Sequence, residues 1–197
     1  LAVGVMALLM LGVFRGNKST DMVGLLSALL LVVVLVLSLT NDTGVAFDGL
    51  FIEDQFTGFV KVLVLVGSAV AVLMAIEYCR REDMQRFEYP ILMAVAALGM
   101  LMMVSANDFI ALYMGIELQS LSLYVLAAFR RDALRSTEAG LKYFVLGALS
   151  SGMLLYGCSL IYGFSGHTGF DGVAEALTAG DSCLLYTSPS PRDLQGS

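Results

Sequence analysis

Long apolar runs separated by short polar stretches make up most of this chain. Six runs can be marked, and they cover about 1–14, 22–39, 56–76, 90–104, 108–129 and 140–163. The second run has no charged residue in 18 positions, close to the ~20 residues that a helix needs to cross a bilayer. The pattern therefore predicts an all-α fold, a polytopic bundle of transmembrane helices.

The two ends of the chain depart from this pattern. The first run has only 14 residues and begins with Leu1, so we expect a first helix whose beginning is missing. Residues 181–197 have no helical period and no apolar face, and they resemble read-through of a vector or adapter more than protein. We therefore expect residues 1–180 to be the N-terminal part of a transmembrane domain and 181–197 to be a non-native tail. A genuine disordered tail is the alternative.

The loops between the runs alternate in charge. Eight basic residues fall in the first, third and fifth loops: Arg15, Lys18, Arg80, Arg81, Arg86, Arg130, Arg131 and Arg135. The second and fourth loops and the segment 164–180 have no lysine or arginine. Because basic loops stay on the cytoplasmic side, we expect the odd-numbered loops inside and the N-terminus facing outward.

Composition narrows the classes of function. The chain is 58% hydrophobic and 14% charged, whereas a soluble domain carries ~25% charged residues. A net charge of −6 offers no basic surface for nucleic acid. The three cysteines (Cys79, Cys158 and Cys183) have no C-x-x-C spacing, and His167 is the single histidine. We therefore expect no disulfide framework, metal site or bound cofactor.

Glu117 is the sharpest functional candidate. It lies nine residues past Asp108, which at ~1.5 Å per residue is about 13 Å deep in a ~30 Å hydrocarbon core. A carboxylate at that depth needs a partner, a hydrated path or a proton. Tyr113, Ser120 and Tyr124 have helical spacing from Glu117 and share its face, which predicts a polar path for protons or ions. A structural hydrogen bond to a neighbouring helix is the alternative.

Lys142 is the second candidate. It lies ~9 Å below the predicted cytoplasmic edge, whereas Glu117 lies ~18 Å from that edge, so a direct ion pair is not expected. A link through water or a hydroxyl and a separate partner for each group both stay open, as does simple snorkelling of Lys142. Snorkelling accounts for Lys61, and Asp54 and Asp108 are expected as N-caps of their helices.

Several strings in the second half of the chain carry a family resemblance. The strings GIEL, YVLAAF, STEAG and LKYFVLGA follow one another in this order. The chain resembles subunit N of the bacterial respiratory NADH–quinone oxidoreductase, complex I, most densely over about residues 88–170. The resemblance implies an antiporter-like fold of 14 helices, of which about six are present here. It also implies proton translocation through Glu117 and Lys142 in a bacterial inner membrane.

The resemblance also implies which parts of the function belong to other subunits. Other membrane subunits of the complex would be the partners, with the lipid bilayer around them, and NADH and quinone would be handled by the complex rather than by this chain. A carboxylate deep in the membrane holds its proton more tightly when it is desolvated and releases it when a cation comes near. Quinone reduction elsewhere could thus load and unload Glu117. A subunit of an Mrp-type cation/proton antiporter and a non-transporting membrane scaffold are the alternative functions.

Overall fold

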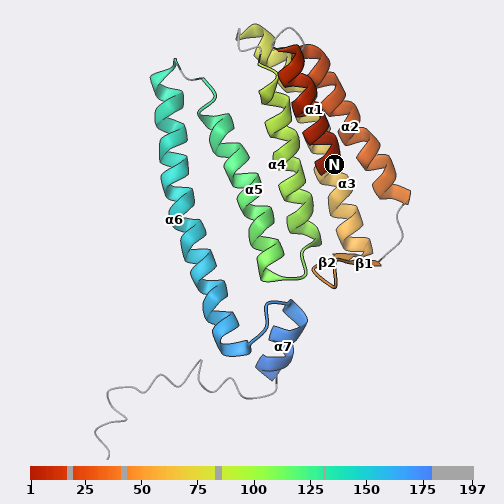
Figure 1. Cartoon of the computed structure of the whole chain (residues 1–197), viewed down its shortest axis with the longest axis vertical. Helices are drawn as coiled ribbons and strands as arrows, with labels where there is room; N and C mark the ends of the chain where they lie inside the picture. The colour runs from red at the N-terminus through yellow and green to blue at the C-terminus, as the bar shows by residue number, and fades with distance from the viewer. Residues whose placement is uncertain (17–19, 41–43, 83–85, 131, 179–197) are drawn as a thin grey trace, which may run out of the picture.

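The computed structural model describes residues 1–16, 20–40, 44–82, 86–130 and 132–178. The first four helices pack together, and the fifth and sixth extend the bundle on one side (Figure 1). In chain order the elements are α1 (Ala2–Arg15), α2 (Thr20–Thr40), β1 (Gly44–Ala46), β2 (Phe51–Glu53), α3 (Gln55–Arg81), α4 (Glu88–Ser105), α5 (Phe109–Ala127), α6 (Leu134–Ser165) and α7 (Phe170–Thr178). Five helices, α2 to α6, are long and apolar enough to cross a membrane. The predicted polytopic helical bundle is confirmed, and the segment 181–197 lies outside the described residues.

Two helices extend beyond the ends that the sequence predicted, and one further helix was not predicted. Helix α3 continues to Arg81 rather than ending near 76, and α6 begins at Leu134 rather than near 140. Both extensions are polar, so a search for apolar runs does not register them although they are compatible with a helix. Helix α7 lies in a segment that was predicted without a helix, and its nine residues are too few to span a membrane.

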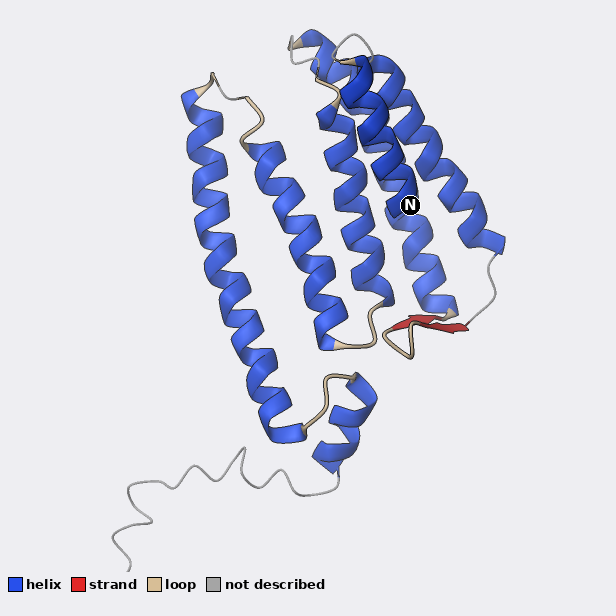
Figure 2. Cartoon of the chain, in the orientation of Figure 1, coloured by secondary structure: helices blue, strands red, loops and turns tan. Residues whose placement is uncertain are grey.

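A small β-hairpin closes the end of the bundle where α2 is followed by α3 (Figure 2). Strands β1 and β2 pair antiparallel, with Gly44 opposite Glu53. The turn between them contains Phe47 and Asp48, both with positive φ, which is unusual for residues other than glycine. Three-residue strands are too short to give an alternating sequence signal, which is why the all-α prediction missed them.

Two aspartates cap the helices that follow this end of the bundle, as the sequence predicted. The Asp54 carboxylate accepts a hydrogen bond from the backbone N–H of Thr57, at 2.6 Å. The Asp108 carboxylate accepts from the N–H groups of Ile110 and Ala111, at 2.7 and 3.4 Å. These bonds satisfy donors that a helix start leaves without partners.

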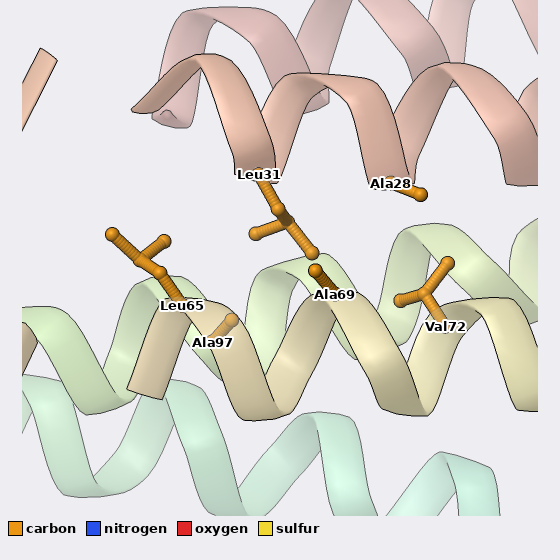
Figure 3. Packing of buried hydrophobic residues seen from close by; sticks show 6 residues of the cluster. All are labelled: Ala28, Leu31, Leu65, Ala69, Val72 and Ala97. Atoms are coloured by element: carbon orange, nitrogen blue, oxygen red, sulfur yellow. The ribbon is translucent and has the colours of Figure 1, made fainter. Parts of the chain in front are cut away.

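The buried core lies among α2, α3 and α4. Figure 3 shows its six side chains: Ala28, Leu31, Leu65, Ala69, Val72 and Ala97. Small side chains let the helices approach closely, which matters where no water drives apolar surfaces together. Helix α6 is the opposite case, because only Gly140 is buried among its residues. Its apolar side chains therefore face outward, as expected for surfaces that meet lipid or further protein.

The described arginines of the loops gather at one end of the bundle. Arg80 pairs with Asp21 at 2.9 Å, and Arg130 pairs with Glu82 at 2.5 Å, so ion pairs connect successive loops there. The opposite end carries the hairpin, the α4–α5 junction and α7 (Figure 1). The alternation of loops between two ends therefore follows the predicted pattern, with Lys18 and Arg131 outside the described residues.

Candidate functional site

Helix α5, which carries Glu117, is held against α4 by two glycines. A Cβ added to Gly99 would lie 2.6 Å from the backbone nitrogen of Gln119, and one added to Gly115 would lie 2.8 Å from that of Met103. Real Cβ atoms do not approach backbone this closely, so only glycine permits the observed contact. The backbone of α5 is thereby fixed on the side facing α4.

The other side of α5 faces α6, which runs antiparallel to it. Small groups on α6 meet larger ones on α5: Gly140 lies against Ala128, and Gly147 lies against the Tyr124 hydroxyl. The two glycines and Ser151 are spaced seven and four residues apart, so they share one face of α6. The predicted polar stripe of α5 therefore points at a neighbouring helix.

Glu117 is half-buried at this interface and has a hydroxyl partner. The Ser151 hydroxyl donates a hydrogen bond to Oε1 of Glu117. The Tyr113 hydroxyl lies 2.9 Å from Oγ of the same serine. The three side chains form a connected chain of hydrogen bonds between α5 and α6. This chain lies within the apolar segments of both helices.

Toward the end of the bundle that holds the arginines, aromatic contacts replace hydrogen bonds along the polar stripe of α5. The Tyr124 ring packs edge-on against Tyr143 at 4.7 Å and against Phe144 at 5.8 Å between centroids. Ser120 is partly buried, and the structure gives its side chain no hydrogen bond within the described ranges. Glu117 and Tyr113 are thus brought together through Ser151, whereas Ser120 and Tyr124 do not join that connected chain.

Lys142 is not brought to Glu117. It pairs with Glu138 one turn earlier on α6, at 2.5 Å, and both side chains are exposed. Lys142 precedes Ser151 by nine residues, which is two and a half helical turns, or about 13 Å along the axis. It therefore lies on the opposite face of α6. The expectation that no direct ion pair joins Lys142 and Glu117 is confirmed, and each has a separate partner.

Lys61 has a partner that the sequence interpretation missed. Its ammonium pairs with Glu53 of β2, and the two side chains are only 16% and 25% exposed. Snorkelling alone is therefore a wrong account of Lys61, since the side chain ties the hairpin to α3. The pair borders a cavity of about 720 Å³, also lined by Ser38 and Ser105, among residues of α2 and α4.

Ser151, whose hydroxyl contacts both Glu117 and Tyr113, was not identified from the sequence. The signal that could have identified Ser151 was the antiparallel pairing of the fifth and sixth apolar runs. Glu117 lies twelve residues before the end of the fifth run at 129, and Ser151 lies eleven residues after the start of the sixth run at 140. Residues at such similar distances face each other in an antiparallel pair, and this places Ser151 level with Glu117. His167 lies in the loop between α6 and α7. Within the described ranges, no group of three or more His, Cys, Asp or Glu could hold a metal ion.

Comparisons with known proteins give a consistent picture. The family described as NADH:quinone oxidoreductase/Mrp antiporter, TM, matches residues 106–188. NADH-quinone oxidoreductase subunit N 1 of Rhizobium meliloti is 58% identical over 180 residues, which is 91% of this chain and 38% of that relative. Subunit N of Paramagnetospirillum magneticum is 59% identical over 182 residues, 91% of this chain and 37% of the relative.

Solved structures agree with the sequence relatives. A chain of respiratory complex I from Thermus thermophilus, solved with bound aureothin, matches 90% of this chain and 40% of its own length. Its TM-score is 0.72 and its sequence identity 31%. A chain of the archaeal membrane-bound sulfane sulfur reductase shares the fold, with a TM-score of 0.62 at 21% identity.

The fold and its half-buried carboxylate thus define a polytopic membrane protein of the antiporter-like class. The chain is similar to part of NADH–quinone oxidoreductase subunit N, as the named relatives show. It spans about 38% of the length of the curated relatives it matches.

Proposed function

We propose that this chain is part of a proton-translocating membrane subunit of an NADH–quinone oxidoreductase, in which Glu117 takes up and releases the proton. One observation carries the proposal: a carboxylate halfway along an apolar helix is half-buried between two helices and is bonded by a hydroxyl rather than by a cation. A hydroxyl can donate to the ionised carboxylate and accept from the protonated one, so both charge states of Glu117 have a partner.

The membrane makes the charge of Glu117 sensitive to its surroundings. An ionised acid at the centre of a membrane helix costs ~2.5–3.5 kcal/mol on insertion scales, so small changes in hydration or nearby charge decide whether the proton stays. We place Lys142 and Glu138 as the next charged group along the path. They lie nearer the basic end and are reached by hydration rather than by direct contact with Glu117.

The energy for this step would come from quinone reduction elsewhere in the complex. Two of the curated relatives are named as subunits of NADH-quinone oxidoreductase, and a matching chain comes from respiratory complex I. We therefore propose other membrane subunits of that complex as partners, with NADH and quinone handled by the complex rather than by this chain. In this assignment the chain contributes to a translocase without itself carrying the redox site.

The orientation follows from charge. We propose that the end holding the described arginines faces the cytoplasm of a bacterium, with the hairpin and α7 on the outer side of the inner membrane. The start of α1 would then point outward.

Replacement of Glu117 by glutamine in the full-length subunit, within the assembled complex, tests the proposal. We expect NADH oxidation to continue with fewer protons moved per electron pair, because glutamine cannot exchange a proton. The measurement is proton uptake into inverted membrane vesicles alongside NADH consumption. Glu77→Gln is the matched control, since Glu77 is exposed and pairs with Arg81 at the end of α3.

Two outcomes separate the alternatives. An unchanged proton ratio in Glu117→Gln would refute the role of Glu117, and loss of assembly with a normal ratio in the remaining complex would favour a scaffold. We further expect Lys142→Ala to lower the ratio more than Lys61→Ala, since the Lys61 partner belongs to the hairpin rather than to the path. An equal or reversed order would contradict the place given to Lys142.

A further inference from the structure

We infer that Ser151 is a positioning residue for the Glu117 proton, and that Tyr113, Ser151 and Glu117 form a hydrogen-bond chain whose direction reverses when Glu117 gains or loses its proton. This inference rests on the proposed function, because it assigns a control element to the same carboxylate. It adds one side chain from α6 and one from α5 to the proton-handling group.

The chemistry of the three groups allows two arrangements of the hydrogen bonds among them. A serine hydroxyl has one donor and two acceptor positions, and an ionised carboxylate only accepts. When Glu117 is ionised, Ser151 donates to Glu117 and accepts from Tyr113. When Glu117 is protonated, its own O–H donates to Ser151, and Ser151 then donates to the Tyr113 oxygen. Either way, the hydroxyl of Ser151 stays bonded on both sides.

Ser151 links the proton to the relative position of two helices. Glu117 and Tyr113 belong to α5, whereas Ser151 belongs to α6. Hydrogen bonds to a charged group are roughly twice as strong as neutral ones and weaken steeply with poor geometry. A small shift of α6 along α5 would therefore withdraw the donor from the ionised carboxylate and favour proton uptake.

Other titratable groups near this interface are few among the described residues. Helix α5 adds Tyr124, and α6 adds Tyr143, whose rings pack together toward the basic end. Lys142 and Glu138 lie on the opposite face of α6 and pair with each other. Helix α4, packed on the far side of α5, carries Glu88 and Tyr89 at its first residues, where Tyr89 contacts Phe129.

The test compares Ser151→Ala with Ser151→Thr in the full-length subunit within the complex. Infrared difference spectra, with Glu117→Gln used to assign the band of the protonated carboxyl, follow its loss as pH rises. We expect Ser151→Ala to move the midpoint upward by about one pH unit or more, because the ionised carboxylate loses a charge-assisted donor. Ser151→Thr keeps the hydroxyl and should restore the wild-type midpoint.

The matched control is Ser150→Ala, because Ser150 is the exposed neighbour of Ser151 on α6. It should leave the midpoint unchanged. Tyr113→Phe should move the midpoint upward by less than Ser151→Ala, since it removes the second hydroxyl rather than the first. A wild-type midpoint in assembled Ser151→Ala would overturn the inference.

The failures of the two proposals can be told apart. A lowered proton ratio in Glu117→Gln together with a wild-type midpoint in Ser151→Ala would overturn the role of Ser151 alone. An unchanged proton ratio in Glu117→Gln would overturn the proposed function and this inference with it. If Ser151→Ala does not assemble, Ser151→Cys replaces it, because a thiol is a weak donor. An upward shift in that variant supports the inference, and a wild-type midpoint overturns it.

Discussion

The two faces of α5 are built on different principles. Toward α4, Gly99 and Gly115 let the two helix backbones approach so closely that there is no room for a Cβ atom. Toward α6, the contacts around Glu117 and Tyr124 are made by side chains: a carboxylate with a hydroxyl, and a tyrosine ring with two aromatic neighbours. Backbone contacts leave little room for adjustment, whereas side-chain ends can rotate.

This difference suits a proton-handling helix. The carboxylate needs a fixed support, so that its surroundings are defined, and an adjustable partner, so that its charge can change. The α4 face supplies the support and the α6 face supplies the partner. The comparison can be tested by placing a methyl group at equivalent small residues on each face.

Gly99→Ala and Gly115→Ala should have the largest effect. The added Cβ meets backbone atoms at 2.6 and 2.8 Å, so the helices must separate, at a cost of about 1–3 kcal/mol or more. We expect a lower thermal midpoint and less assembled complex. Gly67→Ala is the control, because a Cβ there meets nothing within 4 Å and alanine favours a helix by about 1 kcal/mol. Equal stability of Gly99→Ala and Gly67→Ala would break the comparison.

Gly147→Ala should have an intermediate effect. Its Cβ would collide with the Tyr124 hydroxyl, which is the far end of a side chain and can move. We therefore expect a loss of about 1 kcal/mol, partly recovered in the double variant Gly147→Ala/Tyr124→Phe. Thermal unfolding of the four proteins of this double-mutant cycle measures the coupling. Strictly additive effects would show that the two groups are not in contact.

The smallest expected effect is on stability at acid pH, and it concerns Asp54, the N-cap of α3, away from both faces of α5. Hydrogen bonds from the Thr57 side chain and backbone lower the pKa of Asp54. A lowered pKa means that the charged cap stabilises the fold above the ordinary aspartate value of about 3.9, and that this contribution is lost as pH falls through the folded value. We expect Asp54→Asn, which keeps a capping oxygen, to lose less stability than wild type between pH 5 and 3. Identical acid-side slopes in thermal unfolding would contradict this.

The sequence predicts those parts of the structure that depend on one helix at a time. The apolar runs locate the spanning helices, the aspartates Asp54 and Asp108 mark helix starts, and the spacing of Tyr113 and Glu117 gives a shared face. These features need only the geometry of a single helix. The class of fold and the candidate carboxylate therefore follow from local pattern.

Features that depend on two elements were harder to predict. The pairing of Ser151 with Glu117 depends on the register of α5 against α6, and the pairing of Lys61 with Glu53 depends on where the hairpin folds back. The strands were too short to show alternation, and the polar start of α6 hid its first turns. In each case the missing information was the relative placement of neighbouring segments.

The length of α6 has a consequence for its charged pair. Helix α5 has 19 residues, about 28 Å, which fits a ~30 Å hydrocarbon layer, whereas α6 has 32 residues, about 48 Å. Because Gly140 lies opposite Ala128, the turns of α6 before residue 140 overhang the end of α5. For a layer that ends level with α5, Glu138 lies just outside and Lys142 just inside. A thicker or thinner bilayer would move that boundary across the pair, so lipid composition would change the hydration of the Glu138 and Lys142 side chains.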